Sequence, residues 1–121
     1  MADYINQNWQ KLSINDWITI IFQILHCLTI IQLEFPSYKN NEFKLRNIHV
    51  KIINSEIKYF RYDLKNYIFV VPNINILIKI FTSDFSCIDG IVKNGLMNNS
   101  WFNKININKK KNNYYDICFF F

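Results

Sequence analysis

The segment from residue 13 to residue 36 has the most regular pattern of apolar and polar positions in the chain. Its apolar run is interrupted at intervals of three or four residues by polar side chains: Thr19, Gln23, His26, Thr29 and Gln32. That spacing places the polar side chains on one stripe of an α-helix. Ser13 is placed to cap this helix, Asp16 stands three residues on in the capping-box position, and Pro36 ends it.

This predicted helix carries more apolar surface than one small sheet can cover in a chain of 121 residues. We expect it to pack in a bundle shared with a partner chain, with the polar stripe and His26 facing outward. The expected interface with that partner consists of Trp17, Ile18, Ile21, Ile24, Leu25 and Leu28. Alternatively, the uncharged run 17–33 crosses a membrane, but its 17 residues are at the short limit for a span and no flanking charges support it.

From residue 48 onward the pattern changes: apolar and polar residues alternate over 48–52 and 74–81, and residues 67–71 form an apolar run of β-favouring residues. Both patterns predict β-strands. The expected strands are 48–52, 57–62, 67–71, 74–81 and a final one over 114–121. A turn is expected at 54–55 and a hairpin loop at 63–66, and the Asn- and Lys-rich stretch 94–113 is expected to be a loop. The predicted fold class is α+β, with a helical region over 1–38 and a β-rich region over 39–121 that forms a small antiparallel sheet or barrel.

Composition and charge add little to this picture. The chain has 22 Ile, 18 Asn and 11 Phe, a bias that matches AT-rich codons and that we discount as functional evidence. Residues 39–65 hold seven basic and three acidic side chains, and residues 93–121 hold five and one, so each segment has a net charge of +4. Such surfaces favour a phosphate-rich or acidic partner, or are simply solvated. Three widely spaced cysteines and no signal-peptide pattern predict a reducing compartment, cytosol or nucleus.

No residues form a pattern that we assign to catalysis. The two glycines, Gly90 and Gly95, cannot build a phosphate-binding loop of the Walker or dinucleotide type. His26 and His49 are not at metal-ligand spacing, and no Ser/His/Asp or Cys/His arrangement is evident. The sequence therefore predicts no catalytic residue, no metal site, no cofactor and no small-molecule substrate, which favours a binding or assembly role.

The aromatic stretch 60–73, FRYDLKNYIFVVPN, and the helix end at 33–35 resemble the small (gamma) subunit of the eukaryotic general transcription factor IIA. That family ends its helical half in a Leu-x-Phe run and has a signature Tyr-Arg-Phe-Cys-Asp-Asn-Val-Trp-Thr-Phe strand. The positions that match this signature are Phe60, Arg61, Tyr62, Tyr67 and Phe69. Asp63 stands where the family has Cys, and the resemblance covers residues 33–76.

The resemblance implies a heterodimer with the large subunit of the same factor, built from a shared four-helix bundle and a shared β-barrel with Tyr67 and Phe69 inside. It implies a non-catalytic role in the nucleus, where the factor slows dissociation of the TATA-binding protein from promoter DNA before initiation by RNA polymerase II. The implied contacts are Phe60, Arg61 and Tyr62 for the TATA-binding protein, and Lys58 and Lys65 for DNA phosphates. The alternative is a structural subunit of an organellar or membrane-associated complex, held by the helix over 17–33.

Overall fold

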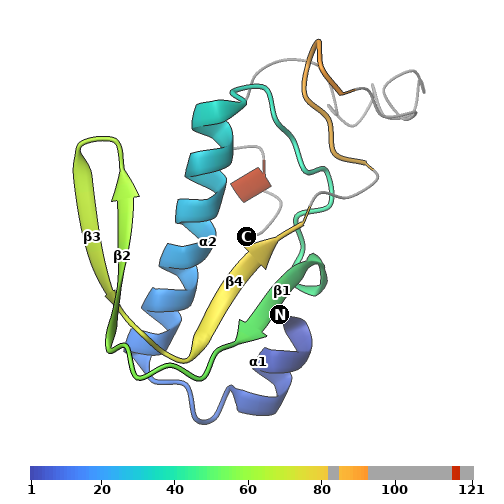
Figure 1. The fold of residues 1–121 in the computed structure, drawn as a ribbon. Helices are drawn as coiled ribbons and strands as arrows, with labels where there is room; N and C mark the ends of the chain where they lie inside the picture. The colour runs from blue at the N-terminus through green and yellow to red at the C-terminus, as the bar shows by residue number, and fades with distance from the viewer. Residues whose placement is uncertain (82–84, 93–115, 118–121) are drawn as a thin grey trace.

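The computed structural model describes residues 1–81, 85–92 and 116–117, and it has the α+β fold expected from the sequence. Its elements, in chain order, are α1 (Ala2–Asn8), α2 (Ile14–Glu34), the short 3-10 helix η1 (Leu45–Asn47), β1 (Ile48–Ile52), β2 (Tyr59–Leu64), β3 (Tyr67–Pro72) and β4 (Ile76–Ile80). In Figure 1 the β2–β3 hairpin stands to the left of α2, and the pair formed by β1 and β4 stands to its right.

Helix α2 begins and ends where the sequence indicates. Its capping box is complete, because the Asp16 amide donates to Ser13 Oγ at 3.2 Å and the Ser13 amide donates to the Asp16 carboxylate at 2.8 Å. The helix ends at Glu34, two residues before Pro36. The N-terminal residues form the separate helix α1, which the expected single helical region did not distinguish.

The polar stripe of α2 does not face outward, which corrects our expectation. Thr19 and Gln23 are each only 3% exposed. The Gln23 side chain donates from Nε2 to the carbonyl oxygen of Ile76 at 3.3 Å, and its Oε1 accepts from the amide of Ile78 at 2.8 Å. Gln23 therefore faces β4, because the backbone of that strand offers hydrogen-bonding groups that only a polar side chain can satisfy.

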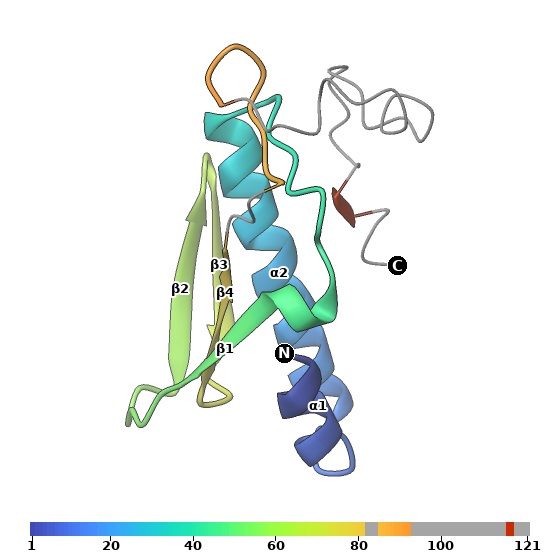
Figure 2. The same cartoon turned by 90° about the vertical axis from the view of Figure 1, so that its right-hand side faces the viewer.

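The strands form two separate antiparallel pairs rather than one sheet or a barrel. Strand β1 pairs with β4, from Ile48 opposite Ile80 to Ile52 opposite Ile76. Strands β2 and β3 form a hairpin whose two-residue loop is shorter than the expected 63–66 loop, because Leu64 already pairs with Tyr67. The hairpin is thus an insertion between two paired strands, and Figure 2 shows it from the side.

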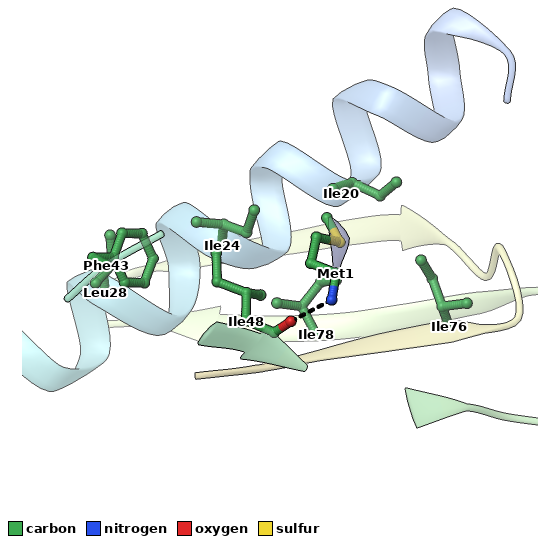
Figure 3. Packing of buried hydrophobic residues seen from close by; sticks show 8 residues of the cluster. All are labelled: Met1, Ile20, Ile24, Leu28, Phe43, Ile48, Ile76 and Ile78. Carbon is green, nitrogen blue, oxygen red and sulfur yellow. Dashed lines mark hydrogen bonds between the residues drawn. The ribbon is translucent and has the colours of Figure 1, made fainter. Parts of the chain in front are cut away.

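The core lies between α2 and the β1–β4 pair. The cluster of buried apolar residues comprises Met1, Ile20, Ile24, Leu28, Phe43, Ile48, Ile76 and Ile78 (Figure 3). The backbone nitrogen of Met1 donates to the carbonyl oxygen of Ile48 at 2.6 Å, which holds the start of α1 against β1. Two of the six predicted interface residues, Ile24 and Leu28, therefore lie in the core of the chain itself.

Aromatic rings attach the hairpin to α2. Phe22 lies 5.2 Å from Tyr62 and 5.3 Å from Phe69 between ring centroids, and His26 lies 4.9 Å from Tyr62. His26 is thus half-buried against the hairpin rather than on the exposed side of the helix. Tyr67 is 68% exposed, so its expected place inside a barrel is wrong.

The C-terminal region departs from the expected final strand over 114–121. Asp116 and Ile117, the residues of this region that the structure describes, are helical. The predicted loop 94–113 lies outside the described residues.

Candidate functional site

A polar loop, residues 39–47, connects the end of α2 to β1 and is held at both ends. The amide of Lys39 donates to the carbonyl oxygen of Cys87 at 3.0 Å, and the amide of Cys87 donates back to Lys39 at 2.9 Å. Ser86 Oγ donates to the carbonyl oxygen of Asn40 at 3.3 Å. The start of the loop is therefore fixed to the segment that follows β4.

A buried carboxylate also holds this start. The amide of Asn40 donates to both oxygens of Asp116, at 2.9 and 3.1 Å, and Asp116 is 0% exposed. Burial raises the pKa of Asp116 to about 6, although hydrogen bonds from the amides of Asn40 and Asn41 and the charge of Lys39 oppose the rise. The Asn40 side chain donates in turn to the Phe81 carbonyl at 3.0 Å. The loop thus has a rigid, fully polar support inside the protein.

The second half of the loop closes on itself. Asn47 Nδ2 donates to the carbonyl oxygen of Glu42 at 2.9 Å, and the Lys44 amide donates to the same oxygen at 2.8 Å. The Asn47 amide donates to the Lys44 carbonyl at 2.8 Å. Between these polar residues Phe43 is 1% exposed and belongs to the core. This closed turn, residues 42–47, is therefore anchored by one aromatic side chain beneath it.

The closed turn carries a carboxylate, Glu42, and a side-chain amide, Asn47, whose orientation is set by a hydrogen bond. The side-chain nitrogen of Asn47, Nδ2, donates a hydrogen bond to the carbonyl oxygen of Glu42. The side-chain oxygen of Asn47, Oδ1, therefore points away from that bond. Glu42 and Asn47 are both half-buried, and among the described residues the Glu42 carboxylate forms no ion pair. A carboxylate and an amide oxygen on a rigid loop can accept a proton and contact a hard cation.

Asn41 helps to hold the same region. It has a positive φ of 61°, a conformation that Asn tolerates better than most residues. Its Nδ2 donates to the carbonyl oxygen of Phe85 at 2.7 Å and approaches Cys87 Sγ at 3.6 Å. The side chain therefore ties the loop to the segment after β4 a second time.

An exposed pair of rings lies just beyond the closed turn. His49 on β1 and Phe81 after β4 have ring centroids 4.5 Å apart, tilted by 58°. Both are exposed, Phe81 by 53%. His49 follows Asn47 by two residues, so this aromatic surface adjoins the turn that carries the two oxygen-bearing side chains.

Two mimivirus proteins are similar to this chain. One carries the name serine/threonine-protein kinase R400, from Acanthamoeba polyphaga mimivirus, and is 42% identical over 125 residues, covering 100% of this chain and 27% of its own length. The other carries the name serine/threonine-protein kinase R301, from the same virus, and is 33% identical over 92 residues, covering 74% of this chain and 22% of its own length. The chain spans about a quarter of each relative. No protein family and no solved structure matches it.

These relatives overturn the transcription-factor interpretation. A match over the whole chain to a protein named as a kinase contradicts the resemblance to the gamma subunit, which covered only 33–76. It also contradicts the expected non-catalytic role, and the alternative of a membrane-held structural subunit gains no support. By length and composition α2 is long and apolar enough to span a bilayer, which is weak evidence because the core helix of a soluble protein passes the same test. The aromatic strands misled us because strands of this kind recur in a chain so rich in Ile, Phe and Tyr.

The structure places the predicted contact residues on the hairpin and helix, away from the closed turn. Arg61 is exposed and pairs with Asp63 at 2.9 Å, while the rings of Phe60 and Tyr62 are half-buried on the opposite face of β2. Lys58 and Lys65 are exposed before β2 and in the hairpin loop. Among the helix residues, Ile18, Ile21 and Leu25 are exposed and Trp17 is half-buried. Their roles toward a large subunit, the TATA-binding protein or promoter DNA, and a nuclear location, stay untested predictions.

The sequence analysis missed Glu42, Asn47 and Asp116. The spacing of Glu42 and Asn47, directly before a β-strand, was the available signal. Asp116 could not be found in this way, because it lies 76 residues from its partner Asn40.

The buried position of Asp116 predicts a specific dependence of stability on pH. Its folded pKa of about 6 lies above its unfolded value of 3.8, so the folded state binds the proton more tightly. Stability from this proton is fully present below pH 3.8 and is lost as the pH rises to 6, by about 3 kcal/mol. Thermal melts between pH 4 and 7 should show this decline in the wild type. Asp116→Asn should remove that part of the slope and Asp3→Asn should not; identical slopes in all three proteins would contradict the prediction.

Proposed function

We propose that residues 39–47 are the catalytic loop of a kinase-like phosphotransferase, in which Glu42 receives the proton of an acceptor hydroxyl and Asn47 contacts a magnesium ion. The observation that carries this proposal is the hydrogen bond from Asn47 Nδ2 to the Glu42 carbonyl oxygen, which closes the turn around these two side chains. The chain covers about a quarter of its kinase-named relatives, so the proposal concerns this part of such an enzyme.

The order of residues in the loop supports the proposal. In protein kinases the catalytic loop reads His-Arg-Asp-Leu followed by three residues and Asn, where the Asp accepts the substrate proton and the Asn holds a metal ion. Here residues 40–47 read Asn-Asn-Glu-Phe-Lys-Leu-Arg-Asn. Glu42 keeps the carboxylate, Phe43 keeps the apolar residue and Asn47 keeps the amide. Asn40 and Asn41 replace His and Arg, and both are hydrogen-bonded as supports of the loop.

The residues present fit a magnesium ion. Magnesium prefers oxygen ligands and keeps several waters, so it needs only one or two protein ligands beside the phosphates of a nucleotide. Asn47 offers its amide oxygen because its nitrogen is already engaged. Asp84, which precedes Phe85 and Ser86 as the Asp of a kinase Asp-Phe-Gly motif precedes Phe and Gly, lies outside the described residues. When bound, the metal would neutralise charge on the transferring phosphoryl group.

The transfer step uses the loop in a simple way. The acceptor hydroxyl oxygen forms a bond to the γ-phosphorus of the nucleotide, and the bond from that phosphorus to the bridging oxygen breaks, releasing the diphosphate. The Glu42 carboxylate orients the hydroxyl and takes its proton. The exposed ring pair of His49 and Phe81, next to the turn, offers a surface on which the base of the nucleotide can stack.

A paramagnetic probe tests the site without requiring turnover. Manganese replaces magnesium at oxygen ligands, so Mn²⁺ with ATP should broaden the NMR amide signals of residues 42–47 more than those of α1. Asn47→Ala should remove this selective broadening, and Asn54→Ala, in the segment between β1 and β2, serves as the matched control. Broadening spread evenly over the chain, or unchanged in Asn47→Ala, would reject the metal site.

Transfer of labelled γ-phosphate to a serine-containing peptide tests the chemistry. Glu42→Gln keeps the shape of the side chain but cannot take the proton, so the rate should fall at least about tenfold. Glu56→Gln, outside the loop, should retain the wild-type rate. Equal rates in wild type and Glu42→Gln would remove Glu42 from its proposed role.

A further inference from the structure

We infer that the closed turn selects acceptor peptides with acidic residues beside the serine or threonine, and that Lys44 and Arg46 together set this preference. The inference rests on the proposed function of the loop and adds a class of substrate to it. The observation behind the inference is that two cationic side chains, Lys44 and Arg46, lie on the same turn as the Glu42 carboxylate.

The geometry of the turn keeps these cations beside the reacting position. Hydrogen bonds from Asn47 and Lys44 to the Glu42 carbonyl close a ring of six residues, 42–47. Lys44 and Arg46 both lie within this ring, and both are exposed. A peptide whose hydroxyl reaches Glu42 therefore passes over a surface from which both side chains project.

The charge of the turn is not neutralised internally. Within the described ranges 1–81, 85–92 and 116–117, the one ion pair joins Arg61 to Asp63 on the hairpin, so Lys44 and Arg46 form none. Glu42 is the single acid of the turn, against two cations. A basic residue next to the acceptor hydroxyl would meet like charge here, whereas Glu, Asp or a phosphorylated residue would meet opposite charge.

Magnitude decides how strong the preference can be. A solvent-exposed ion pair contributes little by itself, so two such pairs against two repulsive contacts predict a ratio of dissociation constants on the order of ten. The preference should weaken at high salt because exposed charges are screened. A nucleic acid fits less well, because two cations neutralise far fewer phosphates than the six to ten contacts of typical DNA-binding proteins.

The test measures peptide binding in the absence of nucleotide. Fluorescence anisotropy compares a serine peptide flanked by glutamates with the same peptide flanked by lysines. We expect the acidic peptide to bind at least about fivefold more tightly. Arg46→Glu should abolish or reverse that ratio, and Arg46→Gln should reduce it; Lys58→Glu makes the same charge change before β2 and should leave it within about twofold.

Three results would overturn the inference. They are equal binding of the two peptides, an equal loss of preference in Arg46→Glu and Lys58→Glu, and tighter binding of a single-stranded oligonucleotide of the same charge. Thermal melts of each variant confirm that it folds, and Arg46→Gln remains informative if Arg46→Glu does not. If the peptide-binding test fails but manganese still broadens the signals of residues 42–47, only the substrate preference is rejected and the proposed function stands. If manganese does not broaden those signals, the proposed function is rejected as well.

Discussion

Replacing Phe43 with alanine is expected to lower the free energy of unfolding by about 3–5 kcal/mol, as truncation of a buried aromatic side chain does. Phe43 is 1% exposed and is one of the buried residues drawn in Figure 3, together with Leu28 of α2. It belongs to the core cluster even though its neighbours in sequence form the polar turn. Its loss leaves a cavity in the core where the turn is anchored, so the turn should lose order together with the core.

Chemical denaturation followed by circular dichroism measures this effect. Phe43→Leu, which restores the residue type of the kinase pattern, should recover most of the stability because it leaves a smaller void. Phe35→Ala is the control, since Phe35 is 38% exposed at the end of α2. If Phe43→Ala and Phe35→Ala cost the same, Phe43 does not anchor the turn.

Gln23→Leu is expected to lower the free energy of unfolding by about 4 kcal/mol, although it keeps the size of the side chain. Gln23 satisfies two buried backbone groups of β4, the carbonyl of Ile76 and the amide of Ile78. Each buried group left without a partner costs roughly 1–3 kcal/mol. Leucine fills the space but satisfies neither group.

The matched control is Gln32→Leu, on the same helix. Gln32 is half-buried, so exchanging it should change stability by less than about 1 kcal/mol. Hydrogen exchange adds a local measurement: the amide of Ile78 should lose protection in Gln23→Leu before the β2–β3 hairpin does. A variant as stable as the wild type would show that water replaces the side chain at β4.

The elements that could be predicted from the sequence are those set by neighbouring residues. The capping box of Ser13 and Asp16 indicated the start of α2, period-two alternation indicated β1 and β4, and the apolar run 67–71 indicated β3. The strand expected over 57–62 is β2, which lies two residues further along the chain. The orientation of α2 could not be predicted, because a buried glutamine that binds a strand and an exposed one that binds water give the same pattern. Strand pairing was equally hidden, since β1 pairs with β4 across the whole inserted hairpin.

The candidate site was only partly visible for a similar reason. Glu42 and Asn47 have the spacing of the Asp and Asn in the kinase catalytic loop. The two residues before Glu42, however, are asparagines, where the kinase pattern has His and Arg. The closing bond from Asn47 and the support from Asp116 depend on the folded chain. The contacts between distant segments, which bring these polar residues together, could therefore not be predicted from the sequence.

The β2–β3 hairpin is a suitable place to insert another domain, because it leaves and rejoins the β1–β4 pair at a single junction. Ile52 and Ile76 are opposite each other, and the amide of Ile53 donates to the carbonyl of Asn75 at 2.9 Å, so the chain exits and returns at one point. The entropy of closing such an excursion grows only with the logarithm of its length. A reporter domain or an affinity module could therefore replace the tip of the hairpin at Lys65 with little effect on Asn47, which directly precedes β1, or on His49, which lies on β1.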